Sequence, residues 1–143
     1  MTDKQYKAKR WLSRCYELNR EIKILEDQLE VTRQRVNNAV GRYEIQEVQT
    51  SRGRGLREDL IGEVIELEDR IQSRLRELIA EDNLTTEAIN SLETSVERSI
   101  MMARYVNRYS WTKIERLYNY SHAHIMRIHL QGLDKIRIEE EQS

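Results

Sequence analysis

The sequence predicts an all-α protein in which an N-terminal coiled-coil helical hairpin precedes a C-terminal three-helix helix-turn-helix domain. Apolar residues recur in steps of three and four along both halves of the chain, which is the period of amphipathic helices. The 143 residues include no proline, so long helices are not interrupted. Charged residues make up 34% of the chain and phenylalanine is absent. This composition favours narrow apolar stripes on solvated helices over a thick globular core.

The first predicted helix carries a coiled-coil seam over residues 11–36. The positions of this seam follow one another at intervals of four and three residues, and only one of them, Thr32, holds a polar residue. At the helical rise such a seam is about 39 Å long. Lys, Arg and Glu fill its flanks. The seam residues are Trp11, Cys15, Leu18, Ile22, Leu25, Leu29, Thr32 and Val36.

A second seam follows after residues 41–55, which hold three of the five glycines and are expected to form a flexible connection. The two helices can fold back as an antiparallel pair within one chain, or each can pair with a second copy. Because a hairpin alone covers Trp11 only in part, we expect a homo-oligomer that associates through the 11–36 seam. Residues 1–92 would form these arms. The second seam consists of Leu60, Val64, Leu67, Ile71, Leu75 and Leu78.

Other features of the first half and of the charge distribution restrict the class of protein. Cys15 is the only cysteine, so it forms no internal disulfide. No apolar run approaches the roughly 20 residues of a membrane span, and the N-terminus lacks the hydrophobic stretch of a signal peptide. We therefore expect a soluble, cytoplasmic protein without a membrane association.

The charge is unevenly distributed along the chain. The net charge is −1, but bases outnumber acids in residues 101–138, and such a local excess of positive charge favours binding of a polyanion.

The C-terminal domain is predicted at residues 93–138, with an acidic tail at 139–143. Three short helices are expected, at about 94–107, 111–118 and 121–138. Asn119 and Tyr120 would form a tight turn, and Ser121 would cap the last helix. Aromatic residues of this domain are expected to pack in its core. The inward-facing residues of the last two helices are expected to be Ile114, Leu117, Ile125, Ile128, Leu133 and Ile136.

A short helix, a tight turn and a longer amphipathic helix are typical of a helix-turn-helix, whose second helix lies in the major groove of double-stranded DNA. Arg127 can donate two hydrogen bonds to guanine, and Ala123 could contact a thymine methyl group. Thr112, Lys113 and Arg116 could hold phosphate groups. The predicted DNA-binding residues are Thr112, Lys113, Arg116, Ser121, His122, Ala123, His124, Met126 and Arg127.

The segment from about Leu92 to Arg137 resembles region 4 of the sigma-70 family of transcription factors. The resemblance is carried by Trp111-x-x-Ile114, Ser121, Ile125-x-x-Ile128 and Gly132-Leu133-x-x-Ile136. It implies a DNA-binding transcription regulator that also contacts RNA polymerase. The chain as a whole resembles small regulatory proteins of Gram-positive bacteriophages and prophages. Glu115 stands where the family usually has Ala or Gly, and His122, Ala123 and Met126 replace the strongly charged residues typical of the recognition face, so a known promoter preference does not transfer.

Other classes of function are less well supported by the sequence. The histidines His122, His124 and His129 are two and five residues apart, which does not place them on one helical face as metal ligands. The chain has no phosphate-binding glycine loop and no nucleophile elbow, so we expect neither an enzyme nor a bound cofactor. The main alternative is a coiled-coil adaptor that binds RNA polymerase or another protein without reading DNA.

Overall fold

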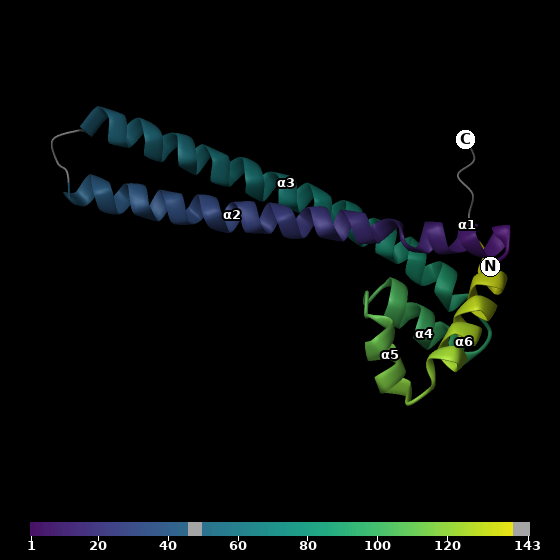
Figure 1. Ribbon diagram of the computed structural model, residues 1–143. Coiled ribbons are helices and arrows are strands. Elements are labelled where there is room, and N and C mark those ends of the chain that lie inside the picture. Colours follow the sequence, from purple (N-terminus) through teal and green to yellow (C-terminus); the bar gives the residue numbers. More distant parts are fainter. Residues whose placement is uncertain (46–49, 139–143) are drawn as a thin grey trace. The chain divides into compact units, whose positions relative to one another are not determined.

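A computed structural model of the chain describes residues 1–45 and 50–138 (Figure 1), and side chains within residues 1–39 and 55–138. The described residues contain helices and no strand, which confirms the all-α class. The elements are α1 (Asp3–Leu12), α2 (Arg14–Ile45), α3 (Thr50–Asn90), α4 (Ser95–Tyr105), α5 (Trp111–Tyr118) and α6 (His122–Lys135). None of these helices has the length and apolar character that a membrane crossing requires.

The chain divides into two compact units whose boundary differs from the predicted one. One unit comprises Leu18–Glu77, and the other combines Met1–Glu17 with Leu78–Ser143. The predicted domain at 93–138 is therefore part of a larger unit that includes the N-terminal helix. The predicted acidic tail, 139–143, lies outside the described residues.

The unit Leu18–Glu77 contains the antiparallel middle parts of α2 and α3 (Figure 1). Leu25 and Leu29 of α2 form a buried cluster with Ile71 of α3, and Val64, Leu67 and Leu75 pack against it. Both predicted seams thus meet within one chain. Thr32, the polar seam residue, is 6% exposed, and its hydroxyl donates to the Gln28 carbonyl oxygen at 2.8 Å, so its burial leaves no unpaired donor.

Helix extends into the segment predicted to be a flexible connection. α2 continues to Ile45 and α3 begins at Thr50, so the prediction is wrong for residues 41–45 and 50–55, and residues 46–49 lie outside the described residues. Glycine disfavours a helix interior by only about 1 kcal/mol per residue relative to alanine. The continuing amphipathic pattern on either side offsets such a cost.

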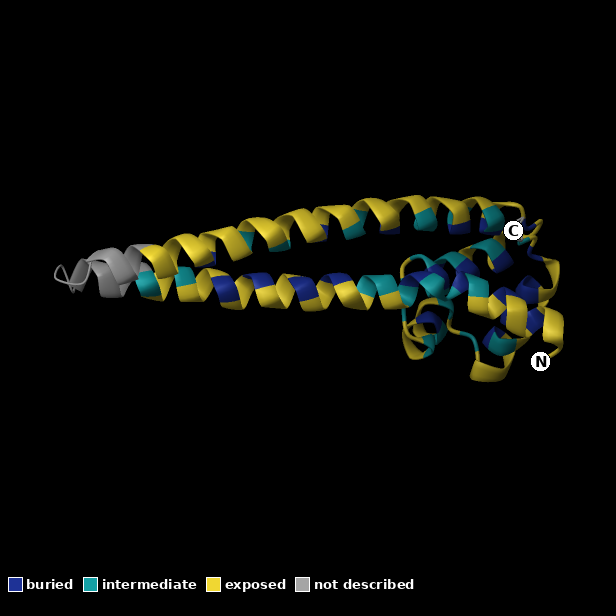
Figure 2. Ribbon diagram, turned by 90° about the horizontal axis from the view of Figure 1, so that it is seen from above, coloured by how far each residue is buried: buried dark blue, intermediate teal, exposed yellow. Residues whose placement is uncertain are grey.

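The larger unit has a core made from both ends of its sequence. Ala8 and Leu12 of α1 pack with Ile89 of α3, Met101 of α4 and Leu133 of α6, and all five are buried. Ser13 ends α1, so the predicted seam does not run as one helix from Trp11, which instead packs against this core. Figure 2 shows the buried positions of this unit on the sides of its helices that face one another.

A second cluster joins α4, α5 and α6. Ile114 of α5 lies against Ile100 and Ala103 of α4 and against Ile125 and Ile128 of α6. The three helices begin at side-chain caps, in which Thr94, Ser110 and Ser121 accept hydrogen bonds from backbone N–H groups three residues ahead. Each cap satisfies a donor that the helix itself cannot pair. These caps set the ends of the helices that carry the candidate site.

Candidate nucleic-acid interface

The turn between α5 and α6 is short because Asn119 adopts a left-handed conformation. Asn119 has φ 54° and ψ 40°, and its N–H donates to the Glu115 carbonyl oxygen. Asparagine tolerates this region better than most residues other than glycine. Ser121 then starts α6, and its Oγ accepts from the His124 N–H at 3.2 Å. The predicted cap at Ser121 is confirmed.

The inner faces of α5 and α6 agree with the sequence at five of the six predicted positions. Ile114, Ile125, Ile128, Leu133 and Ile136 are buried, but Leu117 is 62% exposed. The prediction for Leu117 is wrong because α5 turns Trp111 and Tyr118, three residues before and four after Ile114, towards the cluster. The Tyr118 hydroxyl also hydrogen-bonds with the Ser99 hydroxyl, which leaves Leu117 on the outer side.

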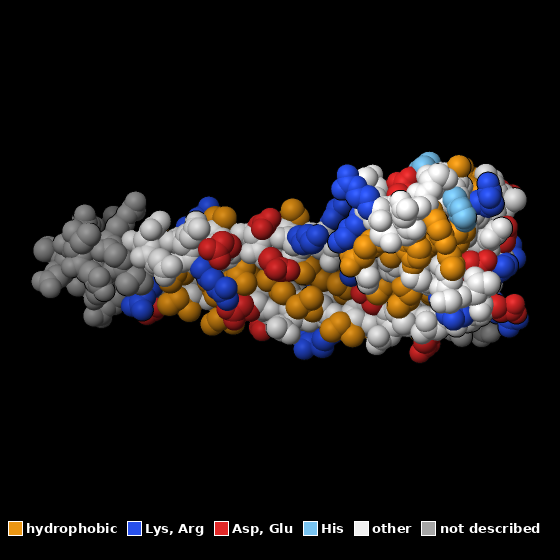
Figure 3. Space-filling view, turned by 90° about the horizontal axis from the view of Figure 1, so that it is seen from below, with side chains coloured by type: hydrophobic (Ala, Val, Ile, Leu, Met, Phe, Trp, Pro, Cys, Tyr) orange, Lys and Arg blue, Asp and Glu red, His pale blue; other side chains and the backbone are white. Residues whose placement is uncertain are grey.

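The predicted DNA-binding residues lie on α5, on α6 and at the cap between them. All are exposed except Met126, which is partly buried and packs against the second cluster. Figure 3 shows histidine and basic side chains at the surface of this unit, next to hydrophobic ones. The exposed members of the set are Thr112, Lys113, Arg116, Ser121, His122, Ala123, His124 and Arg127.

Several of these residues already have partners within the protein. The Lys113 N–H donates to Ser110 Oγ at 3.2 Å, and the Lys113 ammonium lies 3.8 Å from the centre of the Tyr109 ring. His122 Nδ1 is 3.1 Å from Glu115 Oε1. The backbone donor of Lys113 is therefore unavailable to phosphate, whereas its side chain lies at the surface, held over an aromatic ring.

His124 forms a stack that the sequence did not suggest. Its ring lies parallel to that of Tyr120, with 4.3 Å between the ring centres and 5° between their planes, and Tyr118 lies beside Tyr120 at 5.7 Å. This stack holds the His124 imidazole against the turn. Of the exposed predicted DNA-binding residues on α6, Arg127 and Ala123 are the ones whose side chains make no hydrogen bond, ion pair or ring contact with another described residue.

The third histidine is a core residue. His129 is 2% exposed, its Nε2 lies 2.6 Å from the Tyr105 hydroxyl, and Trp111 contacts its ring edge to face at 4.6 Å. Burial lowers the pKa of His129 to about 4, and the positive charges of Lys9 and Arg104 add to this effect. His129 is therefore neutral at physiological pH, and its position on the inner face of α6 at i+4 from Ile125 was the available sequence signal.

Two ion pairs connect separate segments of the larger unit. Arg108, whose φ is 58°, pairs its guanidinium with both carboxylate oxygens of Asp82 at 3.1 and 3.2 Å. Lys135 Nζ lies 2.8 Å from the buried carboxylate of Glu97. Among the described residues, no cluster of His, Cys, Asp and Glu could hold a metal ion.

Comparisons with family models, with curated proteins and with solved structures yield no match to this chain.

Proposed function

We propose that the protein is a sequence-specific DNA-binding transcription regulator that reads the major groove with α6. The observation that carries the proposal is the pairing of a short capped helix, a left-handed residue and a second capped helix whose N-terminal side chains are exposed. This is the arrangement that presents side chains to base edges in a helix-turn-helix. The resemblance of residues 92–137 to sigma-70 region 4 supports the same function, and the resemblance of the whole chain to small phage regulators supports a bacteriophage or prophage origin.

Arg127 is the proposed base-reading residue. It is exposed one helical turn after Ala123, so the two side chains share a face of α6. A guanidinium can donate two parallel hydrogen bonds to guanine, and a methyl group such as that of Ala123 can contact thymine. His122 and His124 would lie at the edge of the same surface, where they can contact a base or a phosphate.

Lys113 and Arg116 are the proposed phosphate-binding residues. Both side chains extend from α5 and are exposed, and the Ser121 hydroxyl, which accepts in its cap, retains a proton that it can donate to a phosphate oxygen. Thr112 can donate in the same way from the first turn of α5. Contacts of this kind position the protein on DNA and make its affinity depend on salt.

Binding of duplex DNA by three variants tests the proposal. We expect Arg127→Ala to weaken binding to the preferred site by about 1–3 kcal/mol and to reduce discrimination at one base pair, because a bidentate contact is lost. Lys113→Ala should weaken binding to all sequences and lower the slope of log affinity against log salt by about one. Lys4→Ala, which removes one charge from α1, is the matched control and should change neither.

The preferred site would be obtained by selecting bound fragments from a random duplex library, and affinities would be measured at several salt concentrations. The proposal would be contradicted if the unchanged protein enriched no particular sequence from the library. It would also be contradicted by an Arg127→Ala protein that is folded and retains its sequence preference. In that case a protein partner becomes the better interpretation. This second candidate is an adaptor that docks on RNA polymerase without reading DNA.

A further inference from the structure

Glu115 on α5 contacts both the turn after its helix and the start of α6. Its carbonyl oxygen accepts from the Asn119 N–H and from the Tyr120 N–H at 3.3 Å. Its side chain is 23% exposed, and one carboxylate oxygen lies 3.1 Å from Nδ1 of His122, the first residue of α6. The backbone and the side chain of one residue thus hold the two halves of the candidate interface together.

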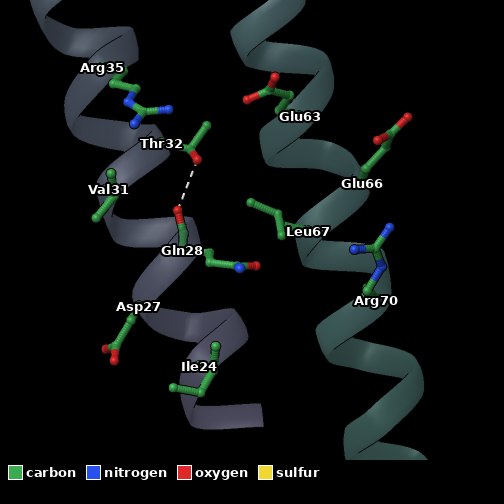
Figure 4. Close-up of a pocket in the computed structure, with 10 residues that line it drawn as sticks. All are labelled: Ile24, Asp27, Gln28, Val31, Thr32, Arg35, Glu63, Glu66, Leu67 and Arg70. Atoms are coloured by element: carbon green, nitrogen blue, oxygen red, sulfur yellow. Dashed lines mark hydrogen bonds between the residues drawn. The ribbon is translucent and has the colours of Figure 1, made fainter. Parts of the chain in front are cut away.

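The Glu115 carboxylate differs from a solvated surface charge. Two acidic residues of the α2–α3 hairpin, Glu63 and Glu66, show the usual state: they line a groove and are exposed to water (Figure 4). The Glu115 side chain has lost most of its exposed surface, and a carboxylate in such a position is stabilised by a donor that replaces its lost hydration. The His122 imidazole is such a donor.

This pair determines which nitrogen of the imidazole carries hydrogen. A carboxylate accepts hydrogen bonds and donates none, so Nδ1 of His122 must donate to Glu115. In a neutral imidazole, the hydrogen bond that one ring nitrogen makes fixes the state of the other. Neutral His122 therefore carries hydrogen on Nδ1 and a lone pair on Nε2. Because the two ring nitrogens face widely different directions, this lone pair is turned away from Glu115.

We propose that Glu115 is a positioning residue that makes His122 a hydrogen-bond acceptor in the major groove, and that His122 thereby selects a base with an amino group, adenine or cytosine. In the major groove, adenine and cytosine present amino groups where guanine and thymine present carbonyl oxygens. The His122 side chain is 66% exposed, so Nε2 is open to such a donor. This selection rests on the proposed function, in which the start of α6 lies in the major groove.

The same lone pair decides between the two kinds of contact that His122 can make with DNA. A phosphate oxygen is an acceptor, so neutral His122 with a bare Nε2 cannot hydrogen-bond to it. The Glu115 carboxylate beside the ring also repels a phosphate group. Arg127, by contrast, carries only donors and suits guanine. His122 and Arg127 therefore read different types of base.

The position of the hydrogen can be measured in the full chain without DNA. Nitrogen-15 NMR of histidine-labelled protein at about pH 8, where an exposed imidazole is neutral, distinguishes a ring nitrogen that carries hydrogen from a bare one. The signals of His122 are those that His122→Ala removes. We expect hydrogen on Nδ1, and we expect Glu115→Ala to populate the form with hydrogen on Nε2. Hydrogen on Nε2 of His122 in the unchanged protein would overturn the proposal.

Binding of duplexes that differ at one base pair tests the selection. That base pair is the one at which His122→Ala alters the preference. There, adenine is compared with guanine and cytosine with thymine, since each couple differs by an amino or a carbonyl group at the same place. We expect the unchanged protein to bind the amino-bearing base about fivefold more tightly. Glu115→Ala should reduce this ratio to about twofold or less, because both forms of the imidazole become available.

Glu87→Ala is the matched control. Glu87 is exposed on α3 within the same unit, so its replacement removes the same charge without contact to His122. Loss of a negative charge changes the affinity for all duplexes in the same direction, whereas the ratio between two bases should stay at its original value. A ratio that falls equally in Glu87→Ala and Glu115→Ala would overturn the positioning role.

A double variant shows whether Glu115 acts through His122 or contacts a base itself. In a protein that already carries His122→Ala, adding Glu115→Ala should leave the base ratios unchanged. A further change would indicate direct contact and would overturn the positioning role. Circular dichroism verifies that each variant is folded. The backbone carbonyl that accepts from Asn119 remains in Glu115→Ala, so the turn keeps its hydrogen bond.

The two measurements separate this proposal from the proposed function. If the unchanged protein selects a sequence but the base ratio does not depend on Glu115, or if His122→Ala alters the preference at no base pair, the proposal for Glu115 and His122 is overturned and the DNA-binding function stands. If the unchanged protein selects no sequence, the DNA-binding function fails and base selection by His122 fails with it, whichever nitrogen carries the hydrogen in NMR.

Discussion

At the residue scale, His129 links the core to the back of the candidate interface. Its ring accepts or donates a hydrogen bond with Tyr105 according to tautomer, and it contacts Trp111. The Arg104 guanidinium lies over the Trp111 ring, 4.5 Å from its centre. A buried imidazole so close to cations is stable only in its neutral form. The unit should therefore be sensitive to acid through this one side chain.

Stability of the larger unit should fall as the pH falls from about 6.5, the ordinary pKa of an unfolded histidine, to about 4, the pKa of His129 in the folded protein. In this window the unfolded chain binds the proton and the folded chain does not, so acid favours unfolding. The contribution of neutral His129 to the free energy of unfolding is fully present above pH 6.5. By pH 4 the free energy of unfolding has fallen by about 3 kcal/mol through this group.

Denaturant unfolding followed by tryptophan fluorescence at pH 7, 5.5 and 4 measures this effect. His129→Gln removes the titrating group but keeps a polar partner for Tyr105, so the difference between the two proteins isolates His129 from the carboxylates. We expect the destabilisation caused by the substitution to shrink as the pH falls. Equal pH dependence of the two proteins would contradict the assignment.

At the element scale, the turn after α5 depends on one backbone conformation. Two non-glycine residues among the described ones have a positive φ. Arg108 lies after α4, and Asn119 lies in the turn between α5 and α6. Ser121 caps α6 immediately after the turn. A turn this short leaves no room to redistribute strain, so the side chain at position 119 should control how readily α5 and α6 adopt their arrangement.

Asn119→Ala should lower the free energy of unfolding by about 1 kcal/mol, because alanine keeps the Cβ that crowds the carbonyl oxygen in the left-handed region but lacks the polar side chain with which asparagine can hydrogen-bond locally. Asn119→Gly is the matched comparison and should be tolerated, since glycine has no Cβ. Thermal melts followed by circular dichroism rank the stabilities of the two variants and the unchanged protein. If both variants melted alike, the left-handed conformation at this position would not limit stability.

At the scale of the whole molecule, the helices that bear the candidate site depend on residues far away in the sequence. α1 packs on α6 through Ala8 and Leu12. The Gln5 amide donates to the Asp134 carboxylate at 3.0 Å and to the Leu130 carbonyl oxygen at 3.3 Å. The N-terminal helix is therefore a structural part of the same unit as α6.

Leu12→Ala should destabilise this unit by about 2–5 kcal/mol, because it opens a cavity beside Leu133 and Ile136. Tyr6→Ala on the same helix, where the side chain is 53% exposed, is the control and should have a small effect. Unfolding by a chemical denaturant measures the change in the free energy of unfolding that each of the two substitutions causes.

A fragment of residues 93–138 extends the same prediction. It lacks Leu12, Ile89 and Leu92, which cover Met101 and Leu133 in the full chain, and it should show little cooperative unfolding. A fragment that unfolds cooperatively and at the temperature of the full protein would contradict the dependence on α1.

The helical class, most of both seams, the cap at Ser121 and five of six inward positions of the last two helices could be predicted from the sequence alone. Periodicity and capping are local, so they can be read from neighbouring residues. Three findings came from the packing of the whole chain: α1 belongs to the same unit as the C-terminal helices, the seams meet within one chain, and Leu117 is exposed while His129 is buried. These outcomes depend on which apolar faces meet, and because hydrophobic burial has no direction, several pairings satisfy one pattern until the whole chain is packed.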